Sequence, residues 1–134
     1  MALSLADAES VMREAREHAA TLGIRVSIAV VDAGANLLAL QRMDGAAPIT
    51  PQVAEGKAVG AALFYRDGGS LLTMANDRPA FFNAVSGMGR SRIVPGLGSV
   101  LITKDSVVLG AVGVSGGKPE QDLECAEAGV SSLK

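Results

Sequence analysis

Aromatic residues and excess positive charge are both missing from this 134-residue sequence. It has no tryptophan, one tyrosine and three phenylalanines, which leaves few side chains for stacking on nucleic-acid bases. Its 12 lysines and arginines are outnumbered by 14 acidic residues, giving a formal net charge of −2. A nucleic-acid partner is therefore not expected.

Cysteine, histidine and long apolar runs are also scarce. The single cysteine, Cys125, excludes an internal disulfide and a cysteine-based zinc site. The single histidine, His18, is too little for a zinc site, although haem iron needs only one strong protein ligand. No apolar run reaches the roughly 18 residues that span a bilayer, and Asp7 and Glu9 stand where a signal peptide would be basic. We therefore expect a cytoplasmic protein without membrane contact.

The chain is instead rich in apolar residues for its size. Hydrophobic residues make up 49% and charged residues 19%, against about 25% charged residues in average domains, and the mean hydropathy is +0.32. The length suits a single domain, residues 1–134, with one modest core. Because a lone small domain has little room to bury so much apolar surface, we predict a homo-oligomer.

Hydrophobic periodicity and turn residues predict an α/β protein of the α+β type. The predicted elements are a helix over 4–22, a hairpin over 25–43 turning at 32–36, a helix over 50–66, a short helix around 70–76 followed by a turn around 79–82, a hairpin over 99–117 turning at 104–105, and a helix over 119–133. Both faces of the strands are apolar, so the sheet should be covered by helices on both sides.

Three residues mark the expected helix ends. Ser4, with Asp7 three positions later, is placed to cap the first helix, and Gly23 is placed to end it. Thr50 is placed to cap the second helix, whose first turn suits Pro51.

Lys57 contradicts the polarity of its own predicted helix. At about 100° per residue it lies beside Val53, Gly60 and Phe64, on an apolar face of small residues. A lysine there must extend to solvent, form an ion pair with an acid, or bind a ligand anion. A structural pair and a ligand role remain equally open, and partial burial would suit Lys57 to proton transfer.

Arg42 and Asp44 lie where the second predicted strand ends. The Arg42 guanidinium can bind a carboxylate or phosphate through two parallel hydrogen bonds. Alternatively, Arg42 pairs with Asp44 or Asp32 at the mouth of the hairpin, while Asp44 and Gly45 form a turn.

The segment GVSGGKPEQD, residues 113–122, joins the last strand to the last helix. It matches neither phosphate-binding glycine motif. The backbone amides of Ser115, Gly116 and Gly117 can still bind a carboxylate at the helix N-terminus. Asp122 competes for these amides from the first turn of the helix, and a cap made by the chain's own carboxylate is the favoured interpretation.

The remaining candidates each have a structural alternative. His18 lies at the border of the first helix's apolar face, as a surface residue or a haem ligand. Cys125 lies off the apolar stripe of the last helix and is expected to be an unreactive packing thiol. Four apolar side chains either line a flat ligand pocket or belong to the core: Met43, Phe64, Phe81 and Phe82.

Three segments resemble the GlcG/HbpS-like family, also described as haem-degrading or domain-of-unknown-function 336 proteins. They are IAVVDAGANLLALQRMDGA, AEGKAVGAALF and GAVGVSGGKPEQDLECAEAG, and the resemblance covers nearly the whole chain. It implies a profilin-like domain with a five-stranded antiparallel sheet sandwiched by helices, and assembly into octamers or smaller oligomers. The family's VVD-x-GG turn is here Asp32-Ala33-Gly34-Ala35, which lacks one glycine.

The resemblance implies a haem-binding or haem-degrading protein, with haem between subunits. His18 then becomes the candidate axial ligand of the iron, and Arg42 and Lys57 would neutralise the propionates. Phe64 and the 115–117 amides complete the expected binding site.

Two other functions remain open. One is a cofactor-free catabolic enzyme (a lyase, isomerase or deaminase) acting on an organic or aromatic-derived acid, in which Arg42 anchors the carboxylate, Lys57 or Asp44 moves a proton and the loop amides stabilise an oxyanion. The other is an assembly module without chemistry.

Overall fold

The computed structural model describes all 134 residues and contains five helices and four strands. They are α1 (Leu5–Leu22), β1 (Ser27–Asp32), β2 (Leu37–Arg42), α2 (Thr50–Phe64), α3 (Gly68–Asp77), α4 (Pro79–Val85), β3 (Ser99–Lys104), β4 (Val107–Ser115) and α5 (Pro119–Ser131). The α+β order predicted from the sequence is confirmed. The turn predicted around 79–82 is wrong, because Pro79 occupies the first turn of a helix, a position where its fixed φ is favourable.

The four strands form one antiparallel sheet in the order β2-β1-β4-β3. Both predicted hairpins are confirmed, and they meet through the pairing of β1 with β4. The expectation of five strands is wrong. Between α4 and β3 the chain is a loop containing Gly96 and Gly98, whose φ angles of 135° and 119° interrupt an extended conformation. The edge strand β3 therefore begins only at Ser99.

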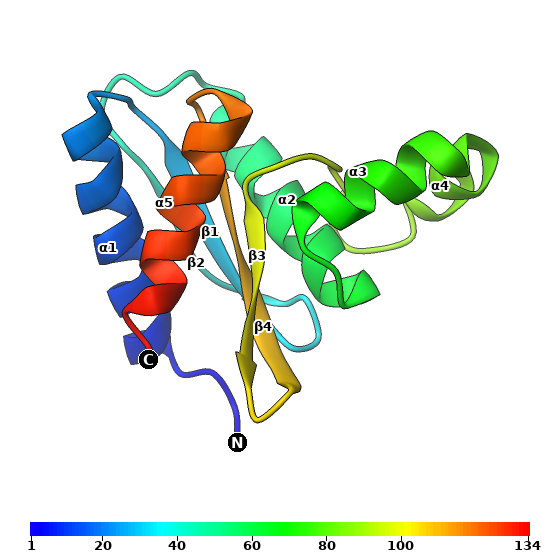
Figure 1. Cartoon of the computed structure of the whole chain (residues 1–134), viewed down its shortest axis with the longest axis horizontal. Coiled ribbons are helices and arrows are strands. Elements are labelled where there is room, and N and C mark those ends of the chain that lie inside the picture. The colour runs from blue at the N-terminus through cyan, green and yellow to red at the C-terminus, as the bar shows by residue number, and fades with distance from the viewer.

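Helices cover both faces of the sheet (Figure 1). The pair α1 and α5 lies on one face and α2 on the other. Successive residues of β1 alternate between two cores, because Ile28 and Val30 pack with α1 and α5 whereas Ala29 and Val31 pack with α2. The predicted two-sided covering is confirmed for β1. It fails for β2, which is an edge strand with largely exposed side chains.

Small residues let α2 lie directly on β4. A Cβ at Gly113 would clash with the carbonyl oxygen of Ala54 and lie 2.8 Å from the backbone nitrogen of Ala58. The alanine-rich face of α2 is therefore the surface that contacts the sheet, and it brings Lys57 close to the end of β4.

The helix ends confirm part of the sequence prediction. Ser4 and Asp7 form a reciprocal capping box, and Gly23 ends α1 in the left-handed conformation. The prediction for Thr50 is wrong, because α2 begins at Thr50 itself and has no side-chain cap. The Thr50 hydroxyl instead lies 2.8 Å from the hydroxyl of Ser27 and joins the start of α2 to β1.

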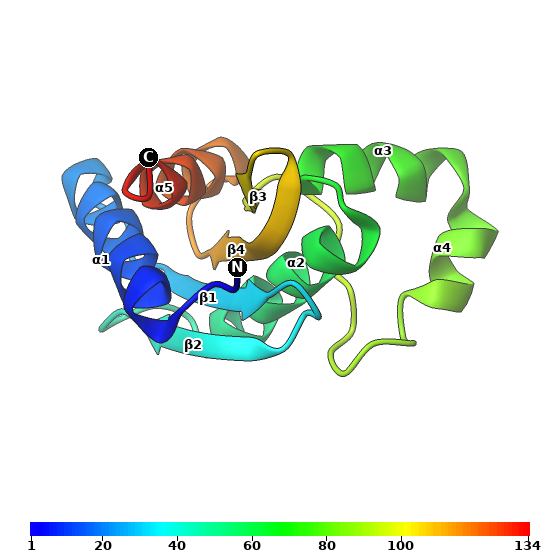
Figure 2. The same cartoon turned by 90° about the horizontal axis from the view of Figure 1, so that it is seen from below.

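The helices α3 and α4 project away from the sheet, as both views show (Figures 1 and 2). Phe82, on α4, is buried in the core that lies between α2 and the sheet. Its neighbour Phe81 is partly exposed, and the Arg78 guanidinium lies 4.1 Å from the centre of its ring. None of the helices has the length and apolar character required to cross a membrane.

Candidate functional site

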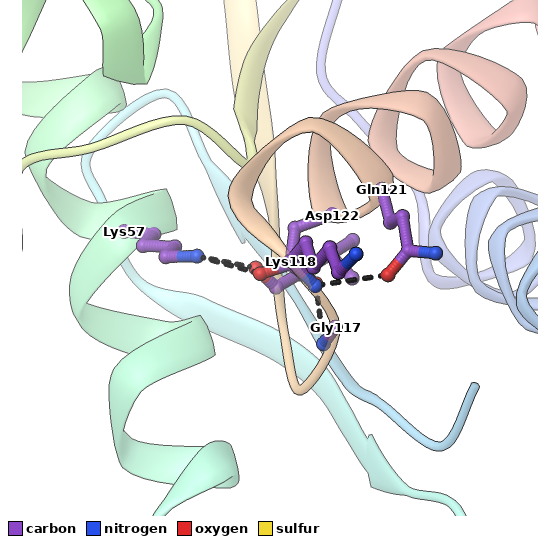
Figure 3. Close-up of polar contacts among 6 residues, drawn as sticks. Lys57, Gly117, Lys118, Gln121 and Asp122 are labelled. Atoms are coloured by element: carbon purple, nitrogen blue, oxygen red, sulfur yellow. Dashed lines mark hydrogen bonds and ion pairs between the residues drawn. The ribbon is translucent and has the colours of Figure 1, made fainter.

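Lys57 and Asp122 form a buried ion pair between α2 and α5 (Figure 3). The Lys57 ammonium lies 3.2 Å from Asp122 Oδ2 and donates a second hydrogen bond, of 2.8 Å, to the carbonyl oxygen of Val114 on β4. The two residues are only 7% and 3% exposed. The structural-pair interpretation of Lys57 is confirmed, and it links the two helix layers through the end of the central strand.

Burial and pairing have opposite effects on Asp122. Desolvation raises the pKa of the Asp122 carboxyl above its ordinary value, while the Lys57 charge and the hydrogen bonds from the Gly117 and Gly116 amides lower it. Because desolvation is the largest effect, the net pKa is raised. The charged carboxylate therefore depends on Lys57 and on these amides to be stable at this position.

Asp122 also holds the glycine-rich turn. The Gly117 amide donates a 2.9 Å hydrogen bond to Asp122 Oδ1, as predicted for a cap made by the chain's own carboxylate. Ser115 is buried at the end of β4, and Gly116 has a φ of 139° that favours glycine. Asp122 therefore occupies the position that a ligand carboxylate would take at this helix N-terminus.

His18 lies on α1 beside α5 and is half-exposed. Its Nε2 is 3.1 Å from Glu124 Oε2 on α5, and its side chain is 35% exposed. His18 lines none of the five main cavities of the chain. The predicted border position is confirmed, and the imidazole is accessible from the α1–α5 surface.

Arg42 and Asp44 share an open hollow in which Lys57 takes no part. Of the two alternatives for Arg42, the pairing with Asp44 or Asp32 is not found, because the guanidinium instead donates a 3.1 Å hydrogen bond to the carbonyl oxygen of Ala46. Asp44 and Gly45 do form the predicted turn. Arg16 and Arg25 also line the hollow and were missed from the sequence. The pairing of Ser27 with Arg42 brings Arg25 beside Asp44, a placement that the local sequence does not show.

The predicted apolar side chains do not gather in one pocket. Phe64 packs against the α2 core, Met43 against the α1–α5 core, and Phe82 is buried beside α3. Cys125 is fully buried, so its predicted place off the apolar stripe is wrong. Its expected role as a packing thiol agrees with its pKa, which burial, together with the charges of Asp122 and Glu124, raises to about 11.

Fold and site together define a single-domain α+β protein whose two helix layers are joined through a buried Lys–Asp pair at a glycine turn. Residues 3–131 match the family described as haem-degrading protein HbpS-like, and the chain belongs to this family. It is 38% identical to protein GlcG of Escherichia coli K12 over 115 residues, covering 84% of this chain and 81% of GlcG.

Two solved structures extend the comparison. A double mutant of HbpS from Streptomyces reticuli has a TM-score of 0.90 at 28% identity and covers 100% of this chain and 88% of its own. A PduOC:haem complex has a TM-score of 0.87 at 26% identity and covers 98% of this chain and 95% of its own. The family resemblance read from the sequence is confirmed.

Proposed function

We propose that this protein binds haem and that His18 is the axial ligand of the iron. The observation that carries the proposal is the similarity of nearly the whole chain to a relative that was crystallised with haem. The match to a family described as haem-degrading supports it. His18, the only histidine of the sequence, is accessible on α1, and a neutral imidazole suffices as a protein ligand for haem iron.

The surroundings of His18 fit a ligand role at a contact between copies. Its present neighbour, Glu124, forms a half-exposed pair with it, and such pairs contribute only about 0–1 kcal/mol. Iron can therefore displace this contact at small cost. Since His18 lines none of the main cavities, the apolar faces of the porphyrin need a second surface. A second copy in a homo-oligomer, an octamer or smaller, would supply that surface.

A hemin titration followed by visible spectroscopy tests the proposal. The wild type is expected to give a saturable Soret shift, and His18→Ala is expected to weaken or abolish it. Cys125→Ser is the matched control, because Cys125 is fully buried with a pKa of about 11 and cannot readily offer a thiolate to the iron. No Soret shift in the wild type would refute haem binding. An unchanged spectrum in His18→Ala would refute the ligand assignment alone.

The alternative of a cofactor-free enzyme for an organic acid has weaker support. One of its two proton-transfer candidates, Lys57, is committed to Asp122 and Val114 and lines none of the main cavities. Its remaining candidates, Arg42 and Asp44, share the open hollow. The geometry therefore favours Arg42 as a carboxylate anchor over Lys57 as a catalytic base.

A further inference from the structure

Three arginines converge on one open hollow at the open end of the β1–β2 hairpin, where β1 begins and β2 ends. Arg16 reaches it from α1, Arg25 from the loop between α1 and β1, and Arg42 from the end of β2. Met43 and Asp44 complete the lining of a hollow of about 360 Å³. This concentration of positive charge does not follow from the composition, because the whole chain has a net charge of −2.

None of these guanidinium groups is neutralised by the protein. The structure has two ion pairs, His18 with Glu124 and Lys57 with Asp122, and neither involves the hollow. Asp44 is the only acidic residue among the lining residues, so three positive charges face one negative charge. Such a local excess of two charges raises the concentration of anions and stabilises a bound one.

Each guanidinium is also held in place by an uncharged oxygen. Arg16 Nη1 donates to the Gln41 side chain at 2.6 Å, Arg25 Nη1 to the Asp44 carbonyl oxygen at 2.7 Å, and Arg42 Nη1 to the Ala46 carbonyl oxygen at 3.1 Å. A guanidinium has five N–H donors, so one hydrogen bond orients each group and leaves the others for a ligand. Anchored arginines lose less conformational entropy when they bind an anion.

We propose that this hollow binds a short dicarboxylate. Two negative charges match the local excess of two positive charges, and guanidinium groups bind carboxylates through paired hydrogen bonds. Met43 supplies an apolar wall for the hydrocarbon that separates two carboxylates, which a free phosphate ion lacks. The site does not rest on haem binding. Arg16 extends to β2 and His18 to α5, so the two side chains leave α1 on opposite flanks.

Calorimetric titration with succinate at low ionic strength and pH 7 tests this site. The wild type is expected to bind succinate, and Arg25→Gln and Arg16→Gln are each expected to weaken binding about tenfold or more, the effect of one charge-assisted hydrogen bond. Arg13→Gln is the matched control, because Arg13 lies on the same helix as Arg16 but outside the hollow. It should weaken binding clearly less than Arg16→Gln, because it removes a neighbouring charge but no hydrogen bond to the succinate.

Three outcomes would overturn the proposal: no succinate binding by the wild type, equal weakening by Arg13→Gln, or phosphate binding as tight as that of succinate. Acetate, with one charge, should bind much more weakly than succinate. Because Arg25 also holds the 44–45 turn, thermal unfolding of each variant is measured alongside, and Arg16→Gln provides a second variant at a different element. The hemin titration of Arg25→Gln should match that of the wild type, so failure of this site and failure of haem binding are told apart.

Discussion

Replacing Lys57 by methionine is expected to destabilise the protein by about 3–5 kcal/mol at neutral pH, the usual cost of removing one partner from a buried ion pair. Methionine keeps the volume and the unbranched stem of lysine but leaves the Asp122 carboxylate, at 3% exposure, without its counter-ion. The lower half of the range is favoured, because the Gly117 amide still donates to Asp122 Oδ1.

A second substitution should recover most of this loss. In Lys57→Met with Asp122→Asn, no charge remains buried, and the asparagine oxygen can still accept from the Gly117 amide. We expect this double variant to lie within about 1–2 kcal/mol of the wild type, since neutral replacements of buried pairs are often well tolerated. The second substitution should then recover about 2 kcal/mol of the stability lost in Lys57→Met.

The stability of Lys57→Met relative to the wild type should depend on pH in a defined direction. Lys57 lowers the pKa of the Asp122 carboxyl against the larger effect of burial, so its removal raises that pKa further. Folded Lys57→Met then holds a proton at pH values where the unfolded chain, with the ordinary value of 3.8, has lost it. Its stability relative to the wild type is lowest above the raised pKa and recovers as the pH falls through that value.

Urea unfolding followed by circular dichroism measures these differences, at neutral pH and at about pH 5, with a fixed protein concentration because an oligomer is predicted. A cost below about 1 kcal/mol for Lys57→Met at neutral pH is typical of an exposed pair and would refute the reasoning. A double variant no more stable than Lys57→Met would refute it as well.

Two further predictions concern packing. Gly113→Ala should lower the free energy of unfolding in urea by about 3 kcal/mol or more, because the added Cβ clashes with the backbone of α2. The control Gly87→Ala, whose Cβ has no atom nearer than 3.7 Å, should change it by less than about 0.5 kcal/mol. Equal costs for the two variants would contradict the packing argument. Ser99→Ala should raise the thermal midpoint, with a gain of about 1 kcal/mol, because the fully buried Ser99 hydroxyl has no hydrogen-bond partner; a loss of stability would indicate a partner for that hydroxyl.

Local signals in the sequence predicted much of this fold. The capping box of Ser4 and Asp7, the left-handed stop at Gly23 and the apolar runs of β1 and β4 each depend on residues close in sequence, and each prediction is confirmed. The failed predictions for Pro79 and Thr50 also rested on local signals alone. Pro79 suits both a turn and the first turn of a helix, and Thr50 suits a cap, so only tertiary packing decides between the alternatives.

The two charged sites required information that the local sequence lacks. Lys57 was recognisable because it contradicts the polarity of its helix, but its partner Asp122 is 65 residues away and was interpreted separately as a cap. Arg16 and Arg25 were missed because their convergence on Arg42 depends on how α1 packs against β2 and on the register of β1 with β2. Charge clusters built across elements are visible only in the folded chain.

The glycine turn, which lies in one of the three segments that carry the family resemblance, is occupied by the protein's own side chains. Asp122 fills the anion position at the N-terminus of α5, and Lys57 neutralises it, so this motif joins α2, β4 and α5 without offering free groups to a ligand. The ligand groups that we propose are instead side chains that remain accessible, His18 on the α1–α5 surface and the arginines at the open end of the hairpin. Two chains that share the glycine turn can therefore differ in what they bind, and substitutions at the accessible positions, rather than in the turn, are the ones expected to change the ligand while preserving the fold.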